Sequence, residues 1–235
     1  ALCAVHAADP VFPYGAVYFR KSNPPEADWA RDHQTAAKIG MNTFRHWFMW
    51  AAIERKPGVY DWSDYDRQMD LAAENGIKTV IAELTHSVPD WAYRQWAHAR
   101  QIRMDGRPLA NHMGVSSSTG GFAHNGAGAL TMNCPEVRDA VGSFLTALAT
   151  RYKGHPGLLG YDVWNEVNYS PEVDYSDWMK ADYRLWLKAK YGTLETLAEA
   201  WYRYSYAEWD DIEPPPELGA YPENLDWLEF KRDNF

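Results

Sequence analysis

Asn165 and Glu166 are the residues of this chain whose types and position could do chemistry. They end the apolar run 160–164, which predicts a short buried strand, and the carboxyl end of a parallel strand is where α/β barrels hold catalytic groups. In a partly apolar surround beside Trp164, desolvation would favour the neutral form of the Glu166 carboxyl, which a proton donor to a glycosidic oxygen requires. The dipeptide fits a solvated glutamate equally well, and glycoside chemistry needs a second carboxylate on another strand.

The elements that must position this pair alternate between short strand-like runs and amphipathic helical stretches, the pattern of a parallel sheet built from βα units. Four units can be placed, with strands near 15–19, 42–46, 78–84 and 160–166. Helices are expected at about 25–39, 63–74, 137–152 and 179–191, followed by a short helix at 193–202, a break at the proline run 214–216 and a last amphipathic piece at 224–235. The segment 87–133 predicts a long loop on the catalytic face, because it is rich in Gly, Ser, His and Asn and lacks periodicity.

Four such units with an acidic residue at a strand end predict an α/β fold of the (β/α)8 TIM-barrel type, of which this chain holds about the first four units. A small doubly wound sheet is the alternative. It predicts a glycine-rich phosphate turn after the first strand, and residues 19–23 contain no glycine. We expect residues 14–235 to form the N-terminal half of a barrel and residues 1–13 to be a tail, whose small residues fit the end of a secretory signal as well as an ordinary terminus.

The composition restricts the partners. The formal net charge is −9, and an acidic surface repels nucleic acid and anionic membranes, so a neutral ligand fits better. No apolar run reaches the roughly 18 to 20 residues of a membrane span. Aromatic residues make up 15% of the chain, with 12 Trp, and their flat faces stack either on sugars or within the core. The expected partner is a carbohydrate, with no nucleic acid and no membrane.

Neither a metal nor another cofactor is expected. Cys3 and Cys134 are the only cysteines, too few for a four-cysteine zinc site, although one disulfide between them stays open. His46, His86 and His155 fall near strand ends or entries, and none of them forms the closely spaced pairs that are typical of metal ligands.

Short motifs occur in a fixed order along nearly the whole chain. They are residues 43–45 (TFR), 50–54 (WAAIE), 57–62 (PGVYDW), 89–91 (PDW), 164–166 (WNE), 183–187 (YRLWL), 191–195 (YGTLE) and 199–201 (EAW). In this order and spacing the chain resembles glycoside hydrolase family 42, the β-galactosidases of the large barrel clan A. The resemblance implies hydrolysis of terminal β-galactosidic bonds by a retaining double displacement, and a homo-oligomer in the full-length protein.

The resemblance also implies roles for particular residues. Glu166 becomes the general acid/base and Asn165 its neighbour in substrate binding. Arg45, at the end of the second predicted strand, becomes part of the sugar subsite, with a structural ion pair as the alternative. Tyr206 falls where the family tends to place an aromatic residue of the sugar site, although core packing explains a tyrosine equally well.

Three departures from the family pattern qualify these expectations. Residues 126–130 hold no arginine where the family commonly has one, which leaves the galactose preference open, and residues 168–171 lack the cysteines of the family's zinc cluster. The nucleophile of this clan is a glutamate at the end of the seventh strand, whereas the chain shows no fifth strand and its acidic residues from Glu208 to Glu229 lie on or near helices. We therefore expect a fragment that holds the acid/base without the nucleophile and is inactive alone.

Two other functions stay open. A different clan A enzyme that acts on glucan, mannan or agar would share the Asn-Glu strand end. A noncatalytic carbohydrate-binding fragment would keep the aromatic loops without turnover.

Overall fold

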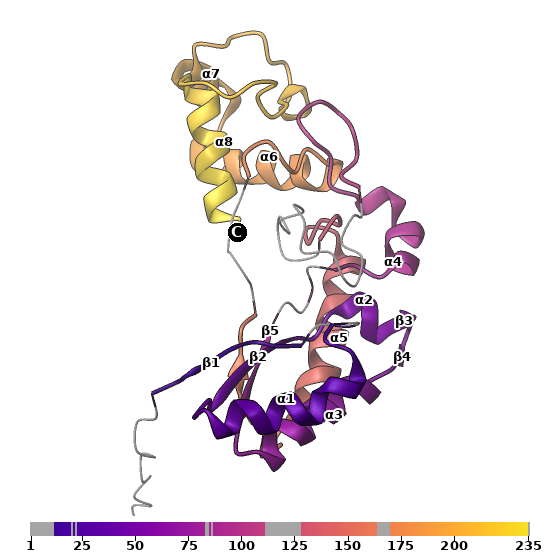
Figure 1. The fold of residues 1–235 in the computed structure, drawn as a ribbon. Helices are drawn as coiled ribbons and strands as arrows, with labels where there is room; N and C mark the ends of the chain where they lie inside the picture. The colour runs from indigo at the N-terminus through magenta and orange to yellow at the C-terminus, as the bar shows by residue number, and fades with distance from the viewer. Residues whose placement is uncertain are drawn as a thin grey trace, which may run out of the picture.

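The computed structural model describes residues 12–19, 21, 23–82, 85, 87–110, 128–163 and 170–234. Within these ranges a parallel sheet lies together with helices at one end of the molecule, and a group of three helices forms the other end (Figure 1). The helices are α1 (Glu26–Lys38), α2 (Trp50–Ile53), α3 (Ser63–Glu74), α4 (Asp90–Gln95), α5 (Pro135–Tyr152), α6 (Asp177–Tyr191), α7 (Leu194–Trp201) and α8 (Pro222–Asp233), with 3-10 turns at Ala97–Ala99 and Trp209–Asp211.

The sheet joins four strands in the order in which they occur along the described chain. β1 (Gly15–Val17), β2 (Thr43–Trp47), β5 (Lys78–Ala82) and β6 (Leu158–Tyr161) each pair in parallel with the next. A doubly wound sheet reverses its strand order at a switch point, and this order shows no reversal. The prediction of about four βα units of a TIM-type barrel is confirmed.

The sheet packs its helices on one face. Trp29 of α1, Met69 of α3 and Phe144 of α5 share one buried cluster with Ile81 of β5. The periodicity that predicted α5 is confirmed by its stripe of buried residues, Val137, Val141, Phe144, Leu148 and Tyr152. These helices cover the outside of the partial barrel, so the opposite face of the sheet is the barrel interior.

A helix and a hairpin between β2 and α3 were not predicted. After α2, β3 (Glu54–Lys56) and β4 (Val59–Tyr60) form an antiparallel pair joined at Pro57 and Gly58. Gly58 has φ +71°, a backbone conformation that residues with a Cβ atom rarely adopt. This explains why a glycine occupies the turn. The strands are two and three residues long, too short for alternation to reveal them in the sequence.

The fourth predicted strand begins earlier and ends earlier than expected. β6 begins at Leu158 and ends at Tyr161, whereas the sequence placed the strand at 160–166. β6 pairs only with β5 among the described strands, and the backbone N–H of Asp162 makes one more bond, of 2.8 Å, to the carbonyl of Ile81. Residues 162–163 after β6 are described and do not belong to a strand.

The last three helices form a second core. Met179, Tyr183 and Leu187 of α6 are buried against Trp201 of α7 and Trp227 of α8. The predicted stripe on α6 is thereby confirmed, and the short helix expected at 193–202 is α7. None of the described helices combines the length and the apolar character that crossing a membrane requires.

The predicted long loop is partly structured. Between α4 and α5, isolated antiparallel bridges join Arg100 to Leu130 and Arg103 to Val173, so residues 100–103 link the loop to the segment just before α6. Residues 111–127, together with the tail 1–11, lie outside the described residues.

Candidate active site

Asn165 and Glu166, the predicted acid/base pair, lie outside the described residues, as does the whole stretch 164–169. The described chain reaches Val163 before them and resumes at Ser170 after them. The geometry of the candidate site is therefore carried by the residues at the carboxyl end of β6 and by the strands beside it.

An ion pair crosses the sheet next to this stretch. The guanidinium of Arg45 donates to Oδ2 of Asp162 from Nε, at 3.0 Å, and from Nη2, at 2.8 Å. The side chains are 20% and 34% exposed, so the pair is only partly screened by water. Arg45 is the third of five residues in β2 rather than its last, because the strand continues to Trp47 in register with Ala82.

Alternation along β2 shows which face Arg45 occupies. Phe44 and His46 are buried on the helix side, so Arg45 between them points to the barrel interior. Val80 pairs with Arg45 and Gly160 pairs with Val80, which places the three residues in one row across the sheet. Asp162, two residues beyond Gly160, lies on the same interior face.

His46 shows the contrasting environment behind the sheet. It is fully buried, and burial, assisted by nearby His33, lowers the pKa of His46 to about 3. Its Nδ1 accepts a 3.2 Å bond from the backbone N–H of Phe19, so the neutral ring carries its proton on Nε2. His46 is a structural residue of the outer layer and not part of the interior site.

Tyr206 lies with the helical end of the molecule. Its ring contacts Trp201 of α7 at 6.3 Å between centroids, and it packs against the cluster of α6, α7 and α8. Burial raises the pKa of Tyr206 above its ordinary value. α7 lies at the opposite end of the molecule from β2 (Figure 1), so the structure does not bring Tyr206 together with Arg45.

The motif residues of the segment 50–58, which follows β2, are joined to one another and to Trp91 by hydrogen bonds. The carboxylate of Glu54 accepts from Nε1 of Trp50 at 2.5 Å and from the backbone N–H of Gly58 at 2.7 Å. Nε1 of Trp91 donates to the backbone carbonyl of Glu54 at 2.8 Å. Trp50 is completely buried, so this tryptophan of the motif packs in the core instead of facing a ligand.

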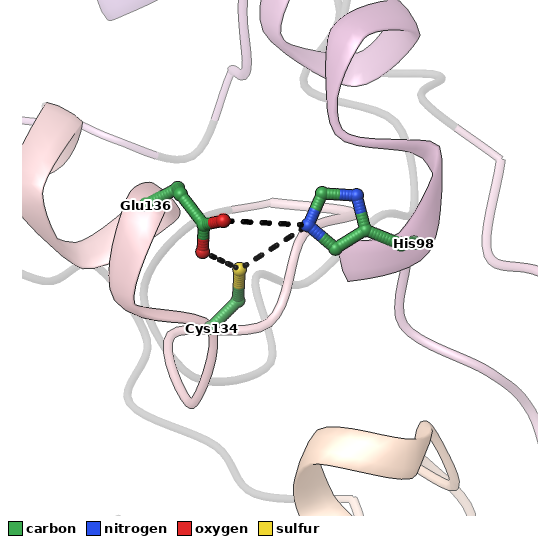
Figure 2. A group of neighbouring side chains, drawn as sticks. All are labelled: His98, Cys134 and Glu136. Atoms are coloured by element: carbon green, nitrogen blue, oxygen red, sulfur yellow. Dashed lines mark hydrogen bonds and ion pairs between the residues drawn. The ribbon is translucent and has the colours of Figure 1, made fainter.

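Three side chains that could hold a metal ion converge elsewhere, at the start of α5. His98, Cys134 and Glu136 place one ligand atom each within 4.8 Å of one another (Figure 2). The sequence predicted no metal site from its two cysteines and from the spacing of its histidines, and it did not connect these three residues, which come from two separate segments.

Asp162 is the residue of the site that the sequence reasoning did not single out. It belongs to the run 160–166 that was taken as a strand ending in Glu166, and it is the only charged residue of that run before Glu166. A charged side chain in an apolar strand needs a partner of opposite charge. That partner, Arg45, is 117 residues away in the sequence, and only the pairing of the strands shows that the two side chains meet.

Comparison with known proteins places the chain among enzymes of one family. A family model described as beta-galactosidase, glycoside hydrolase 42, matches residues 18–235. Beta-galactosidase LacZ of Heyndrickxia coagulans is 29% identical over 231 residues, which cover 94% of this chain and 32% of that protein. The beta-galactosidase of Thermus thermophilus is 27% identical over 224 residues, which cover 93% of this chain and 33% of that protein.

Solved structures show the same relation. The beta-galactosidase of the psychrophilic Marinomonas ef1 superposes with a TM-score of 0.76 at 26% identity, over 93% of this chain and 33% of that one. The enzyme of the haloarchaeon Halorubrum lacusprofundi, at 23% identity and a TM-score of 0.75 over 93% of this chain and 32% of that one, shows the fold alone. The chain spans about a third of the length of the curated relatives it matches. Because the family model matches almost its whole length, the chain belongs to glycoside hydrolase family 42, the beta-galactosidase family.

Proposed function

We propose that the protein that contains this chain hydrolyses terminal β-galactosidic bonds by a retaining double displacement, with Glu166 as the general acid/base. Family membership supports the reaction class, and the curated relatives it matches are named beta-galactosidases. The observation that carries the proposal is the Arg45–Asp162 ion pair on the interior face of the sheet. Asp162 lies four residues before Glu166 in the chain. It marks a polar, partly desolvated position at the end of a parallel strand, where barrels keep their sites.

In this proposal Glu166 first protonates the glycosidic oxygen and later takes a proton from the attacking water. Asn165 binds a sugar hydroxyl beside it. Arg45 is held by Asp162 in one geometry, so it loses little conformational freedom when it contacts the sugar. Tyr206 lies farther from Arg45, and its ring would contact the sugar only where the helical end of the molecule faces the substrate.

The nucleophile, in this proposal, comes from a further strand of the barrel. The elements described after β6 are helices, and the acidic residues Glu223 and Glu229 lie on one of them, α8. The carboxylate of a retaining partner should lie about 5 to 5.5 Å from that of Glu166. The isolated 235-residue chain is therefore expected to show no turnover.

The leaving group distinguishes an acid/base from other roles. In the complete protein, Glu166→Ala should lower kcat/KM for lactose by about 100- to 10,000-fold, because the sugar leaving group needs a proton. For a nitrophenyl β-galactoside the loss in the first step should be much smaller, since nitrophenolate leaves without one. Added azide should then restore turnover of the nitrophenyl substrate and give the β-galactosyl azide.

The matched control is Glu195→Ala, which removes an exposed glutamate in the first turn of α7 and should leave both rates unchanged. Equal losses on the two substrates, without azide rescue, would assign Glu166 another role. Higher rates on glucan, mannan or agar oligosaccharides than on β-galactosides would instead favour another activity of the same clan. Sugar binding with no turnover in the complete wild-type protein would indicate a noncatalytic binding protein.

A further inference from the structure

Three ligand atoms converge at the junction between the long loop and α5. Nε2 of His98 lies 3.9 Å from Sγ of Cys134 and 3.9 Å from Oε1 of Glu136. Sγ of Cys134 lies 3.0 Å from Oε2 of Glu136. Figure 2 shows the histidine approaching from the 3-10 turn on one side and the other two side chains from the beginning of α5 on the other.

These separations fit one tetrahedral ion. With Zn–S near 2.3 Å and Zn–N and Zn–O near 2.1 Å, tetrahedral angles give ligand-to-ligand distances of about 3.4 to 3.6 Å. The observed distances of 3.9, 3.9 and 3.0 Å lie on both sides of these values, so small side-chain rotations would equalise them. The donor set, one thiolate, one imidazole and one carboxylate, suits Zn²⁺ more than Mg²⁺ or Ca²⁺.

The backbone fixes the two segments independently of any ion. The N–H of Gln101 donates to the carbonyl of Ala129 at 2.9 Å, and the N–H of Thr131 donates to the carbonyl of Ala99 at 2.9 Å. Arg100 and Leu130 complete an antiparallel bridge between these bonds. The ligands therefore stand on a preformed support, which lowers the entropy lost when an ion binds.

A cysteine nucleophile explains the arrangement less well. In a catalytic cysteine–histidine pair, the third group orients the histidine through its second ring nitrogen. Here the same atom, Nε2 of His98, faces both the thiol and the carboxylate. Burial and the neighbouring Glu136 raise the pKa of Cys134, the opposite of what activates a nucleophilic thiol.

The exposure and the charge of these three side chains suit the binding of a cation. The side chains of His98 and Glu136 are 52% and 53% exposed, so ions can enter from solvent, while Cys134 is completely buried. The thiol proton, which now faces Glu136, leaves to solvent when a metal binds. Thiolate and carboxylate together then balance the two positive charges, and water completes the fourth position.

We propose that His98, Cys134 and Glu136 form a site for a single divalent zinc-like cation, which ties the loop before it to the start of α5. The ligands of this site differ from those of a four-cysteine cluster, and the proposal stands against the sequence-based expectation of no metal. It does not depend on Glu166 or on turnover.

Cobalt absorption tests the site directly. The chelator-treated chain is titrated with Co²⁺, and a thiolate-to-cobalt charge-transfer band that saturates at one ion per chain is expected in the near ultraviolet. Zn²⁺ should displace the cobalt. Cys134→Ser should abolish the band, and His98→Gln or Glu136→Gln should each weaken Zn²⁺ binding by about tenfold or more.

Two controls keep the result specific. Cys3→Ser should keep the band, because Cys134 alone supplies the thiolate. His155→Gln removes the imidazole of another histidine–carboxylate pair, with Asp70 at 3.3 Å, and should leave affinity unchanged. His98 is half exposed, so His98→Gln should fold even where a change at buried Cys134 does not. Absence of the band in the wild type, or its survival in folded Cys134→Ser, would overturn the proposal.

Discussion

At the residue scale, the buried imidazole of His46 couples stability to pH. Its pKa is lowered to about 3 in the folded chain, whereas an unfolded histidine titrates near about 6.5. Between these pH values the unfolded chain binds more protons than the folded one. The contribution of His46 to the unfolding free energy is therefore fully present above pH 6.5 and decreases as the pH is lowered toward 3. Protonation of Nδ1 would also break its bond with the N–H of Phe19.

We expect the unfolding free energy to decrease by about 2 kcal/mol through this histidine when the pH is lowered from 7 to 5. Denaturant unfolding at several pH values measures the slope in the wild type and in His46→Leu, which removes the titrating group at similar volume. The variant is less stable at pH 7 because Phe19 loses its acceptor, but its slope should be smaller by that amount. Parallel slopes in the two proteins would show that His46 does not titrate in this range.

At the scale of elements, one carboxylate holds the last three helices together. Asp226 of α8 accepts from Nζ of Lys190 at 2.8 Å and from the hydroxyl of Tyr191 at 2.7 Å, both at the end of α6. It also accepts from Nε1 of Trp201 at the end of α7, at 2.8 Å. Its side chain is only 7% exposed, so these bonds lie in a poorly screened environment.

Asp226→Ala should lower the unfolding free energy by about 3 kcal/mol, because it leaves the buried indole N–H of Trp201 without its acceptor. Glu229→Ala is the matched control. Glu229 binds the same lysine at 2.6 Å but is 41% exposed, so its loss should cost less than about 1 kcal/mol. Chemical denaturation of both variants checks the difference, and equal effects would mean that Asp226 acts as a surface charge.

At the scale of the whole molecule, the described part of the sheet begins and ends with an edge strand. Among the described strands, β1 and β6 each pair on one side only. Val17 on β1 is 57% exposed and Val163 just after β6 is 65% exposed. Unpaired strands with exposed apolar side chains are surfaces on which further strands or a second chain add.

The isolated chain should therefore self-associate as its concentration rises, which sedimentation velocity measures. Val17→Lys combined with Val163→Lys should reduce the association, because charges on edge strands oppose pairing, and should change stability by less than about 0.5 kcal/mol per site. Val59→Lys is the control, since Val59 is 61% exposed but lies on the β3–β4 hairpin. Association that is equally strong in the double variant would place the contact elsewhere.

Local patterns in the sequence determined most of the elements and the family. The stripes on α5 and α6 were predicted because a helix buries every third or fourth residue, and their buried residues match. The βα alternation gave the parallel sheet, and the order of the short motifs gave the resemblance that the family model bears out. The roles of Asn165 and Glu166 remain predictions from that resemblance.

Only the tertiary structure decided which distant residues meet. Arg45 finds Asp162 because β2, β5 and β6 align in a register that places both on the interior face. His98 and Cys134 converge because backbone bonds join two segments of the loop, and no sequence spacing encodes that bridge. Local propensity fixes what each segment becomes, whereas the pairing of segments far apart depends on packing of the whole chain, which short-range patterns do not contain.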